Sequence, residues 1–171
     1  GIVVLKKSGI TKLEDLKDVD VVIEAVIEDL ELKKEVFSQL DEIVKEDVIL
    51  ATNTSSMSIT EIAAATKRPD RVAGMHFFNP AQLMKLVEIV RGFETSDETV
   101  TTLKALSAQL NKEVVEVKKD TPGFIVNRIM IPQFIEAIRL LEEGVASVED
   151  IDKAVKFGLN YPMGPFELQD Y

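Results

Sequence analysis

Apolar and polar positions follow a repeating pattern over the first two thirds of the chain, and this pattern predicts strands separated by helices. Residues 19–26 are β-branched and apolar almost throughout, as in a strand buried on both faces of a sheet. In residues 31–45 the apolar positions recur at the 3.6-residue spacing of a helix. The same alternation predicts further strands over 48–52, 72–78, 86–91 and 114–118, and helices over 59–66 and 97–110. Strands that alternate with helices indicate a largely parallel α/β sheet.

The pattern becomes helical after residue 119. Thr121 and Pro122 are the residue types favoured at the N-cap and first position of a helix. A long apolar helix is expected from there to about Glu143, with a kink at Pro132. The sequence of residues 147–150 resembles a capping box and predicts the start of another helix.

This change of pattern divides the chain into two predicted domains. We expect residues 1–119 to form an α/β domain and residues 120–171 to begin a helical domain that the chain leaves incomplete. Residues 1–7 are ambiguous, because their apolar run fits either a strand or the end of a helix.

Composition excludes several functional classes. The 171 residues carry a net charge of −10, which disfavours nucleic acid and anionic membrane surfaces as partners. No apolar run approaches the ~18–20 residues of a membrane-spanning helix. The absence of cysteine excludes disulfides and thiolate chemistry, and a single histidine disfavours a structural zinc site, so no metal is expected. A soluble cytoplasmic protein fits this composition, although a targeting segment ahead of Gly1 stays possible.

Two residues offer acid–base chemistry. His76 is the only histidine, and Glu88 interrupts an apolar strand-like run twelve positions later. A carboxylate buried without a partner costs several kcal/mol, so Glu88 needs a cation or a donor. His76 is one candidate, and Lys85 or Arg91 is the alternative. A lone histidine is more often a hydrogen-bonded core residue than a base, but a carboxylate on one ring nitrogen fixes the tautomer and leaves the other nitrogen free as a base.

Other polar residues follow the ends of the predicted strands, where ligands bind in open α/β sheets. Glu28 and Asp29 follow the first of these strands, residues 53–56 follow the second, and Asn79 closes the third. For residues 53–56, capping of the helix that begins near Ile59 is an equally good explanation.

Five ordered motifs resemble the L-3-hydroxyacyl-CoA dehydrogenase family, which includes 3-hydroxybutyryl-CoA dehydrogenases and modules of multifunctional fatty-acid oxidation proteins. The similarity extends from about Lys12 to the end of the chain. The motifs are Asn53-Thr-Ser-Ser, Gly74-Met-His-Phe-Phe-Asn-Pro, Met84-Lys-Leu-Val-Glu, Asp120-Thr-Pro-Gly-Phe-Ile-Val-Asn-Arg and Tyr161-Pro-Met-Gly-Pro-Phe-Glu.

The resemblance implies a fold and a reaction. The fold would be a partial Rossmann-type, mostly parallel sheet from the C-terminal part of an NAD-binding domain, followed by the first helices of a helical domain. The reaction would be the reversible NAD-dependent oxidation of L-3-hydroxyacyl-CoA to 3-ketoacyl-CoA in fatty-acid or butyrate metabolism. The partners would be an acyl-CoA substrate and, in the intact parent protein, a second copy in a homodimer.

The resemblance also implies roles for individual residues. His76 would be the general base that takes the proton of the substrate's 3-hydroxyl, with Glu88 orienting the ring. Ser55 and Asn127 would hydrogen-bond the substrate oxygen. The nicotinamide end of the cofactor would be contacted by Glu28, Lys33, Ser55 and Asn79.

One expected motif is missing. The family begins with a Gly-x-Gly-x-x-Gly turn that brings backbone amides to the dinucleotide phosphates. None of the eight glycines here stand at Gly-x-Gly spacing. We therefore expect an interior part of a dehydrogenase, truncated at both ends, that by itself binds NAD poorly and turns over slowly or not at all.

Two other functions stay open. One is an inactive family member kept for acyl-CoA binding or structure. The other is a related Rossmann-type enzyme with a different substrate, although such relatives commonly use a lysine base. The sequence leaves acyl chain length, and NAD against NADP, undecided.

Overall fold

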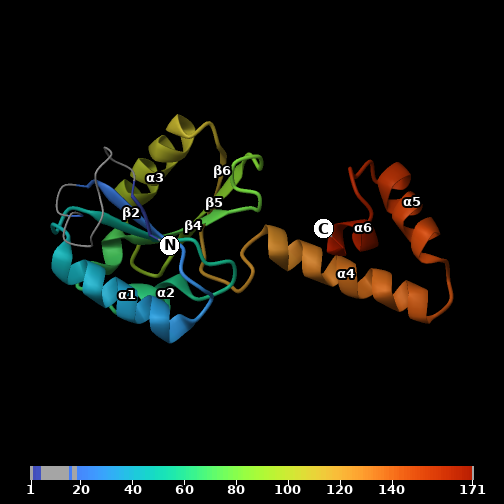
Figure 1. Ribbon diagram of the computed structural model, residues 1–171, viewed down its shortest axis with the longest axis horizontal. Helices are drawn as coiled ribbons and strands as arrows, with labels where there is room; N and C mark the ends of the chain where they lie inside the picture. Colours follow the sequence, from blue (N-terminus) through green and yellow to red (C-terminus); the bar gives the residue numbers. More distant parts are fainter. Residues whose placement is uncertain (1, 5–15, 17–18, 171) are drawn as a thin grey trace. The chain divides into compact units, whose positions relative to one another are not determined.

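The computed structural model describes residues 2–4, 16 and 19–170, which fall into two compact units (Figure 1). The units are Gly1–Phe124 and Ile125–Tyr171. The division lies a few residues beyond the boundary expected near residue 119. Part of the reason is that the Asp120 carboxylate accepts hydrogen bonds from the Ser58 hydroxyl at 2.7 Å and the Thr60 amide at 2.9 Å, which ties this segment to the first unit.

A six-stranded sheet with sequential strand order forms the centre of the first unit. The pairs β2–β3, β3–β4 and β5–β6 are parallel, and β1–β2 and β4–β5 are antiparallel. The expectation of a mostly parallel sheet is therefore confirmed. The strands are β1 (Ile2–Val4), β2 (Val21–Glu24), β3 (Ile49–Thr52), β4 (Val72–Phe77), β5 (Leu86–Arg91) and β6 (Glu113–Val117). In the ambiguous N-terminal segment, residues 2–4 are strand; the other residues of 1–7 lie outside the described part of the chain.

Helices cover both faces of this sheet (Figure 1). On one face lie α1 (Leu30–Ile43) and α2 (Ile59–Ala63), and on the other lies α3 (Asp97–Gln109). A short 3-10 helix, Pro69–Arg71, leads into β4. Two separate apolar cores result, because successive residues of a strand point to opposite faces. The first core includes Val22, Phe37, Leu40, Leu50, Ile59 and Ile62, and the second includes Ile23, Ala51, Met75, Ile89, Val100 and Leu103.

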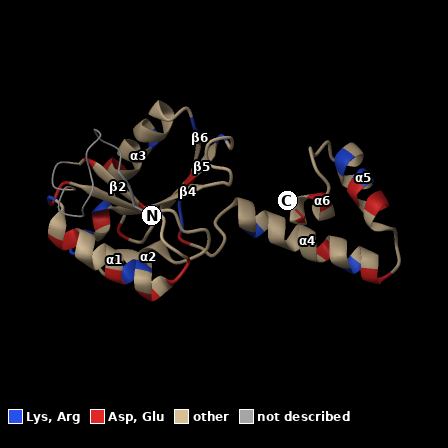
Figure 2. Cartoon of the chain, in the orientation of Figure 1, with Lys and Arg blue, Asp and Glu red and all other residues tan. Residues whose placement is uncertain are grey.

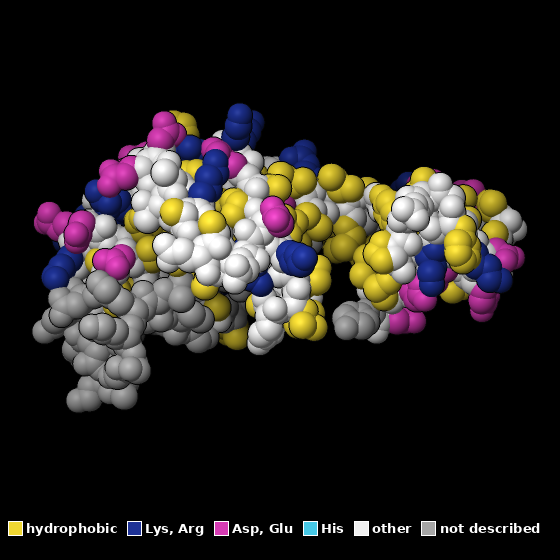
Figure 3. Space-filling view, turned by 90° about the horizontal axis from the view of Figure 1, so that it is seen from above, with side chains coloured by type: hydrophobic (Ala, Val, Ile, Leu, Met, Phe, Trp, Pro, Cys, Tyr) yellow, Lys and Arg dark blue, Asp and Glu magenta, His cyan; other side chains and the backbone are white. Residues whose placement is uncertain are grey.

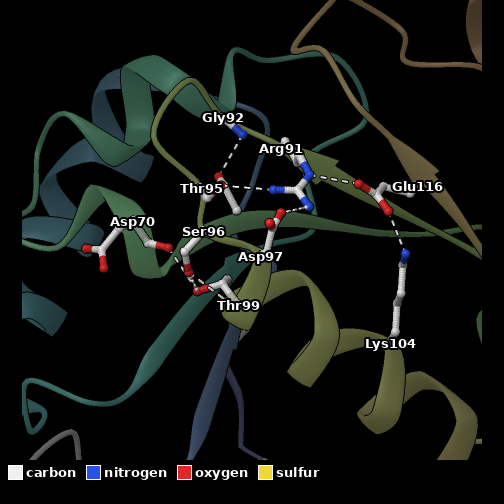
Figure 4. A network of polar contacts seen from close by, with 9 residues as sticks. All are labelled: Asp70, Arg91, Gly92, Thr95, Ser96, Asp97, Thr99, Lys104 and Glu116. Carbon is white, nitrogen blue, oxygen red and sulfur yellow. Dashed lines mark hydrogen bonds and ion pairs between the residues drawn. The ribbon is translucent and has the colours of Figure 1, made fainter.

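A network of polar contacts joins β5, β6 and α3 (Figure 4). Arg91 donates to the Glu116 carboxylate at 2.8 Å and to that of Asp97 at 2.7 Å, and Lys104 donates to the second oxygen of Glu116 at 2.5 Å. Hydrogen bonds from Lys104 and Arg91 lower the pKa of Glu116 to about 2. The network fixes the end of β5, the strand that carries Glu88.

The second unit contains α4 (Val126–Glu142), α5 (Val148–Gly158) and α6 (Pro165–Gln169). The expected start of α5 is confirmed, since the Ser147 side chain accepts a hydrogen bond from the Asp150 amide. The acidic side chains of α5 lie in its first half and the basic ones in its second half (Figure 2). Apolar side chains also reach the surface of this unit, among them Ile129, Ile131 and Ile135 of α4 (Figure 3).

The expected start of α4 at Thr121 and Pro122 is wrong. Residues 122–125 form turns, and the helix begins at Val126. Gly123 has a φ of 74° and Phe124 a φ of 49°, in the left-handed region that a right-handed helix cannot contain. Pro132, where the sequence predicts a kink, lies inside α4. None of the helices in the described residues is long and apolar enough to cross a membrane.

Candidate active site

His76 and Glu88 form a buried dyad between neighbouring strands. They are register partners in the antiparallel β4–β5 pair, so their side chains lie on the same face. His76 Nδ1 and Glu88 Oε2 are 2.8 Å apart, and the two residues are 4% and 0% exposed. Of the alternatives to this pairing, Arg91 binds Glu116 and Asp97. An ionised carboxylate can only accept, so the neutral ring carries its proton on Nδ1 and leaves Nε2 as the acceptor.

Two phenyl rings pack against the imidazole. The centroid of Phe78 lies 4.6 Å from that of His76, and the Phe124 ring meets it nearly edge-on at 5.5 Å. Phe124 is buried, and it lies in the turn that follows Asp120, whose carboxylate binds α2. The imidazole is therefore held by a hydrogen bond on one nitrogen and by aromatic contacts on its ring.

Hydrogen bonds link the loops that follow β2 and β3 to each other and to the last residue of β4. The exposed Glu28, in the β2–α1 loop, accepts from the Thr54 hydroxyl at 2.7 Å and the Ser55 amide at 3.2 Å. Asn53 Oδ1 accepts from the Phe77 amide at 2.8 Å, one residue beyond His76. These contacts gather the carboxyl ends of three strands, the position at which open α/β sheets bind ligands.

Lys33 lies in an interior position. Its ammonium group is fully buried, donates to Glu24 Oε1 at 2.8 Å and donates to the Val26 carbonyl at 3.3 Å. Glu24 was missed by the sequence reasoning, although it carries the same signal as Glu88, a carboxylate inside an apolar strand that needs a partner. The cofactor contact implied for Lys33 stays a prediction.

The remaining site candidates lie in different places. Asn79 is an exposed residue two positions after β4. Asn127 is the second residue of α4 and belongs to the second unit. The structure thus brings His76 together with Glu88, and Glu28 together with Ser55. Among the described residues, no group of three or more histidine, aspartate or glutamate side chains could hold a metal ion.

A mostly apolar cavity of about 560 Å³ opens beside these carboxyl ends. Its lining includes Ala25, Asn53 and Phe77, which belong to the loops and strand end just described, together with Leu110 and Lys112. The glycine turn for the phosphates is not in this sequence.

The first unit is a Rossmann-like α/β fold with a buried His–Glu dyad, and helices follow it. A family model described as the NAD-binding domain of 3-hydroxyacyl-CoA dehydrogenase matches residues 3–121, and the model of its C-terminal domain matches residues 123–171. The chain belongs to the 3-hydroxyacyl-CoA dehydrogenase family, as the motifs predicted, and NAD is the cofactor of this domain.

Relatives and solved structures agree with this assignment. A 3-hydroxybutyryl-CoA dehydrogenase of Clostridioides difficile is 58% identical over 163 residues, which cover 95% of this chain and 58% of the relative. The mitochondrial hydroxyacyl-coenzyme A dehydrogenase of Sus scrofa is 56% identical over 152 residues, covering 89% of this chain and 48% of the relative. The crystal structure of the (S)-3-hydroxybutyryl-CoA dehydrogenase of Ralstonia eutropha matches with a TM-score of 0.88 and 53% identity, covering 92% of this chain and 55% of that one. The chain spans about half the length of the curated relatives it matches.

Proposed function

We propose that the whole protein catalyses the reversible NAD-dependent oxidation of an L-3-hydroxyacyl-CoA to the 3-ketoacyl-CoA. The observation that carries this proposal is the buried contact of 2.8 Å between His76 Nδ1 and Glu88 Oε2. Alcohol oxidation needs a base that works near neutral pH, and imidazole supplies one. The relatives named as 3-hydroxybutyryl-CoA dehydrogenases support the substrate class.

In the proposed mechanism, His76 Nε2 accepts the proton of the substrate's 3-hydroxyl. Glu88 keeps the ring in the productive tautomer and stabilises the imidazolium that forms. NAD, when bound, accepts the hydride that leaves C3 of the substrate. In the reverse direction His76 returns its proton to the oxygen as the ketone is reduced.

Further side chains would hold the reactants in place. We propose that Ser55 and Asn127 hydrogen-bond the substrate oxygen, where negative charge develops. Glu28, Lys33, Ser55 and Asn79 would hold the nicotinamide end of the cofactor. We propose also that the whole protein is a cytoplasmic homodimer, an assembly supported by the exposed isoleucines of α4.

The test is the reduction of acetoacetyl-CoA by NADH in the whole protein and in its His76→Gln variant. Loss of the proton acceptor should lower kcat by at least about 100-fold, the usual contribution of a general base. A rate within about a factor of two of wild type would contradict the mechanism. Binding of acyl-CoA without turnover in the wild-type protein would instead favour an inactive family member.

A further inference from the structure

Asp120 links the end of the first unit to the start of α2. Its Oδ2 atom accepts from the Ser58 hydroxyl at 2.7 Å and from the Thr60 amide at 2.9 Å, and both donors lie 60 or more residues earlier in the chain. Ser58 is the N-cap of α2 and also accepts from the Glu61 amide, so the direction of its hydroxyl group is fixed from both sides. The proposed reaction gives Asp120 no role.

The turn that follows Asp120 has an unusual backbone. Gly123 has a φ of 74° and Phe124 a φ of 49°, and this left-handed conformation is rare for a side chain as bulky as phenylalanine. Such a conformation persists only where its surroundings impose it. Within the turn the Phe124 amide donates to the Thr121 carbonyl at 3.1 Å, and just before the turn the Asp120 carboxylate is bound to α2.

Phe124 connects this turn to the imidazole of His76. Its ring is 2% exposed, belongs to the apolar core that α1 and α2 cover, and lies 5.5 Å from the His76 ring at an interplanar angle of 63°. The χ2 torsion of a histidine has a broad energy profile. One hydrogen bond, from Nδ1 to Glu88, therefore leaves the plane of the ring, and with it the direction of Nε2, to be set by packing.

We propose that Asp120 is a positioning residue for His76. Its carboxylate, bound to the start of α2, holds residues 121–124 in the conformation that packs the Phe124 ring against the imidazole and so directs Nε2. Asp120 acts on His76 only through Phe124. The inference rests on the proposed function for the role of His76 as the base, whereas the packing of the two rings can be measured without any turnover.

Three variants of the whole protein test this role. Asp120→Ala removes both hydrogen bonds to α2. Asp120→Asn is the conservative variant, because the amide oxygen of asparagine can accept from the same two donors. Phe124→Leu removes the aromatic contact with His76 and keeps an apolar side chain in the core.

Asp41→Ala is the matched control for lost stability. The Asp41 carboxylate also joins two segments that are distant in sequence, since it accepts from the Lys67 amide at 3.0 Å and from Arg68 Nε at 2.6 Å. Its removal leaves the buried Arg68 without its counterion, which is strongly destabilising. Lys67 and Arg68 precede β4, whereas His76 lies near the other end of that strand, so the imidazole should not respond.

The first readout is the NMR chemical shift of the His76 ring protons, assigned with His76→Gln, in protein without dinucleotide or substrate. An adjacent aromatic ring shifts these protons, and Phe124→Leu gives the size of that contribution. In Asp120→Ala the signals should move most of the way to their positions in Phe124→Leu. In Asp120→Asn and Asp41→Ala they should stay at their wild-type positions.

The second readout is the reduction of acetoacetyl-CoA by NADH. Asp120→Ala and Phe124→Leu should each lower kcat by about tenfold, with KM for NADH changed less than about threefold, because a misdirected base weakens the transition state and leaves cofactor binding intact. The double variant should also lose about tenfold, since both changes remove one and the same contact. Asp120→Asn and Asp41→Ala should keep kcat within about threefold of wild type.

Three results would overturn the proposal. Wild-type ring-proton shifts in a folded Asp120→Ala variant would show that Asp120 does not hold Phe124 against His76. A loss of about a hundredfold in the double variant would show that Asp120 and Phe124 act independently. A loss of about tenfold in Asp41→Ala would make the effect one of stability alone.

Two further outcomes stay decisive. If Asp120→Ala does not fold, Ser58→Ala removes one of the two donors to Asp120, and its ring-proton signals should move in the same direction; unchanged signals there would also overturn the proposal. If the wild-type protein reduces no acetoacetyl-CoA, the proposed function fails, and the ring-proton shifts of His76 still decide the role of Asp120.

Discussion

Replacing Glu88 by glutamine tests the dyad with the smallest change of shape. Glutamine keeps the size of the side chain and an oxygen that can accept from His76 Nδ1, so the strand pair β4–β5 should persist. The bond changes from charge-assisted to neutral, a difference of about 1 kcal/mol in the free energy of unfolding. The variant removes only the negative charge that faces the ring at 2.8 Å.

The kinetic effect should be much larger than the effect on stability. When the ring accepts the substrate proton it becomes a cation about 4 Å from the centre of the carboxylate charge. Two such charges attract by about 4 kcal/mol at an effective dielectric constant of about 20. Loss of this attraction in the transition state corresponds to about a thousandfold in kcat, at 1.36 kcal/mol per factor of ten. An amide that turns its NH2 group toward the ring would also favour the wrong tautomer, as a similar substitution does in a serine protease triad.

The assay is the oxidation of NADH by acetoacetyl-CoA in the whole protein, with a denaturant unfolding curve for each variant. Glu113→Gln is the matched control, since Glu113 is an exposed carboxylate on the adjoining β6, and its kcat should equal that of wild type. In this chain, where His76 is the only histidine, nitrogen NMR of its ring also reports the tautomer. A folded Glu88→Gln variant that loses less than about tenfold in kcat would refute the charge-stabilisation argument.

Two further predictions concern stability. Glu116 has a pKa of about 2 against an ordinary 4.5, so its stabilisation is present above about pH 4.5 and is lost as the pH falls toward 2. In urea unfolding at pH 7, Glu116→Gln should be less stable than wild type by on the order of 1 kcal/mol, a figure that allows for solvent screening of this partly exposed group. Near pH 2 the unfolding curves of variant and wild type should coincide. Coinciding curves at pH 7 would contradict the prediction. At Gly74 an added Cβ would lie 2.9 Å from side-chain atoms of both Ile59 and Val90. Gly74→Ala should therefore destabilise the protein by about 1–3 kcal/mol in thermal unfolding. Gly158→Ala is the control and should leave stability unchanged, because no atom lies within 4 Å of the Cβ it would add.

The sheet and the dyad could be predicted because each leaves a local signal. Every strand between β2 and β6 is an apolar run bounded by polar residues, and the observed ends lie within two residues of the expected ones. Glu88 is conspicuous because a carboxylate is rare in such a run, and the need to pair it led to His76. The resemblance then supplied the family, which residue patterns alone do not name.

Other features could not be predicted because they depend on backbone geometry or on distant contacts. The sequence Thr121-Pro122 favours a helix start, but the left-handed conformations of Gly123 and Phe124 postpone the helix to Val126. No local signal shows that Asp120 caps α2, because its partners lie about sixty residues earlier. Lys33 looks like an ordinary helix residue until the fold places it against Glu24.

Two buried carboxylates, Glu24 and Glu88, connect the strands of the sheet to residues of the candidate site. Glu24 and Glu88 both lie in strands, where cross-strand pairing fixes the backbone. Glu88 reaches its partner across the antiparallel β4–β5 register, so a slip of one residue would turn it to the opposite face and break the dyad. Glu24 reaches its partner through a helix, and the loop between them is held as a consequence. The sheet thus holds His76 directly through Glu88, and the loop between β2 and α1 is tied to the sheet through the buried pair of Glu24 and Lys33.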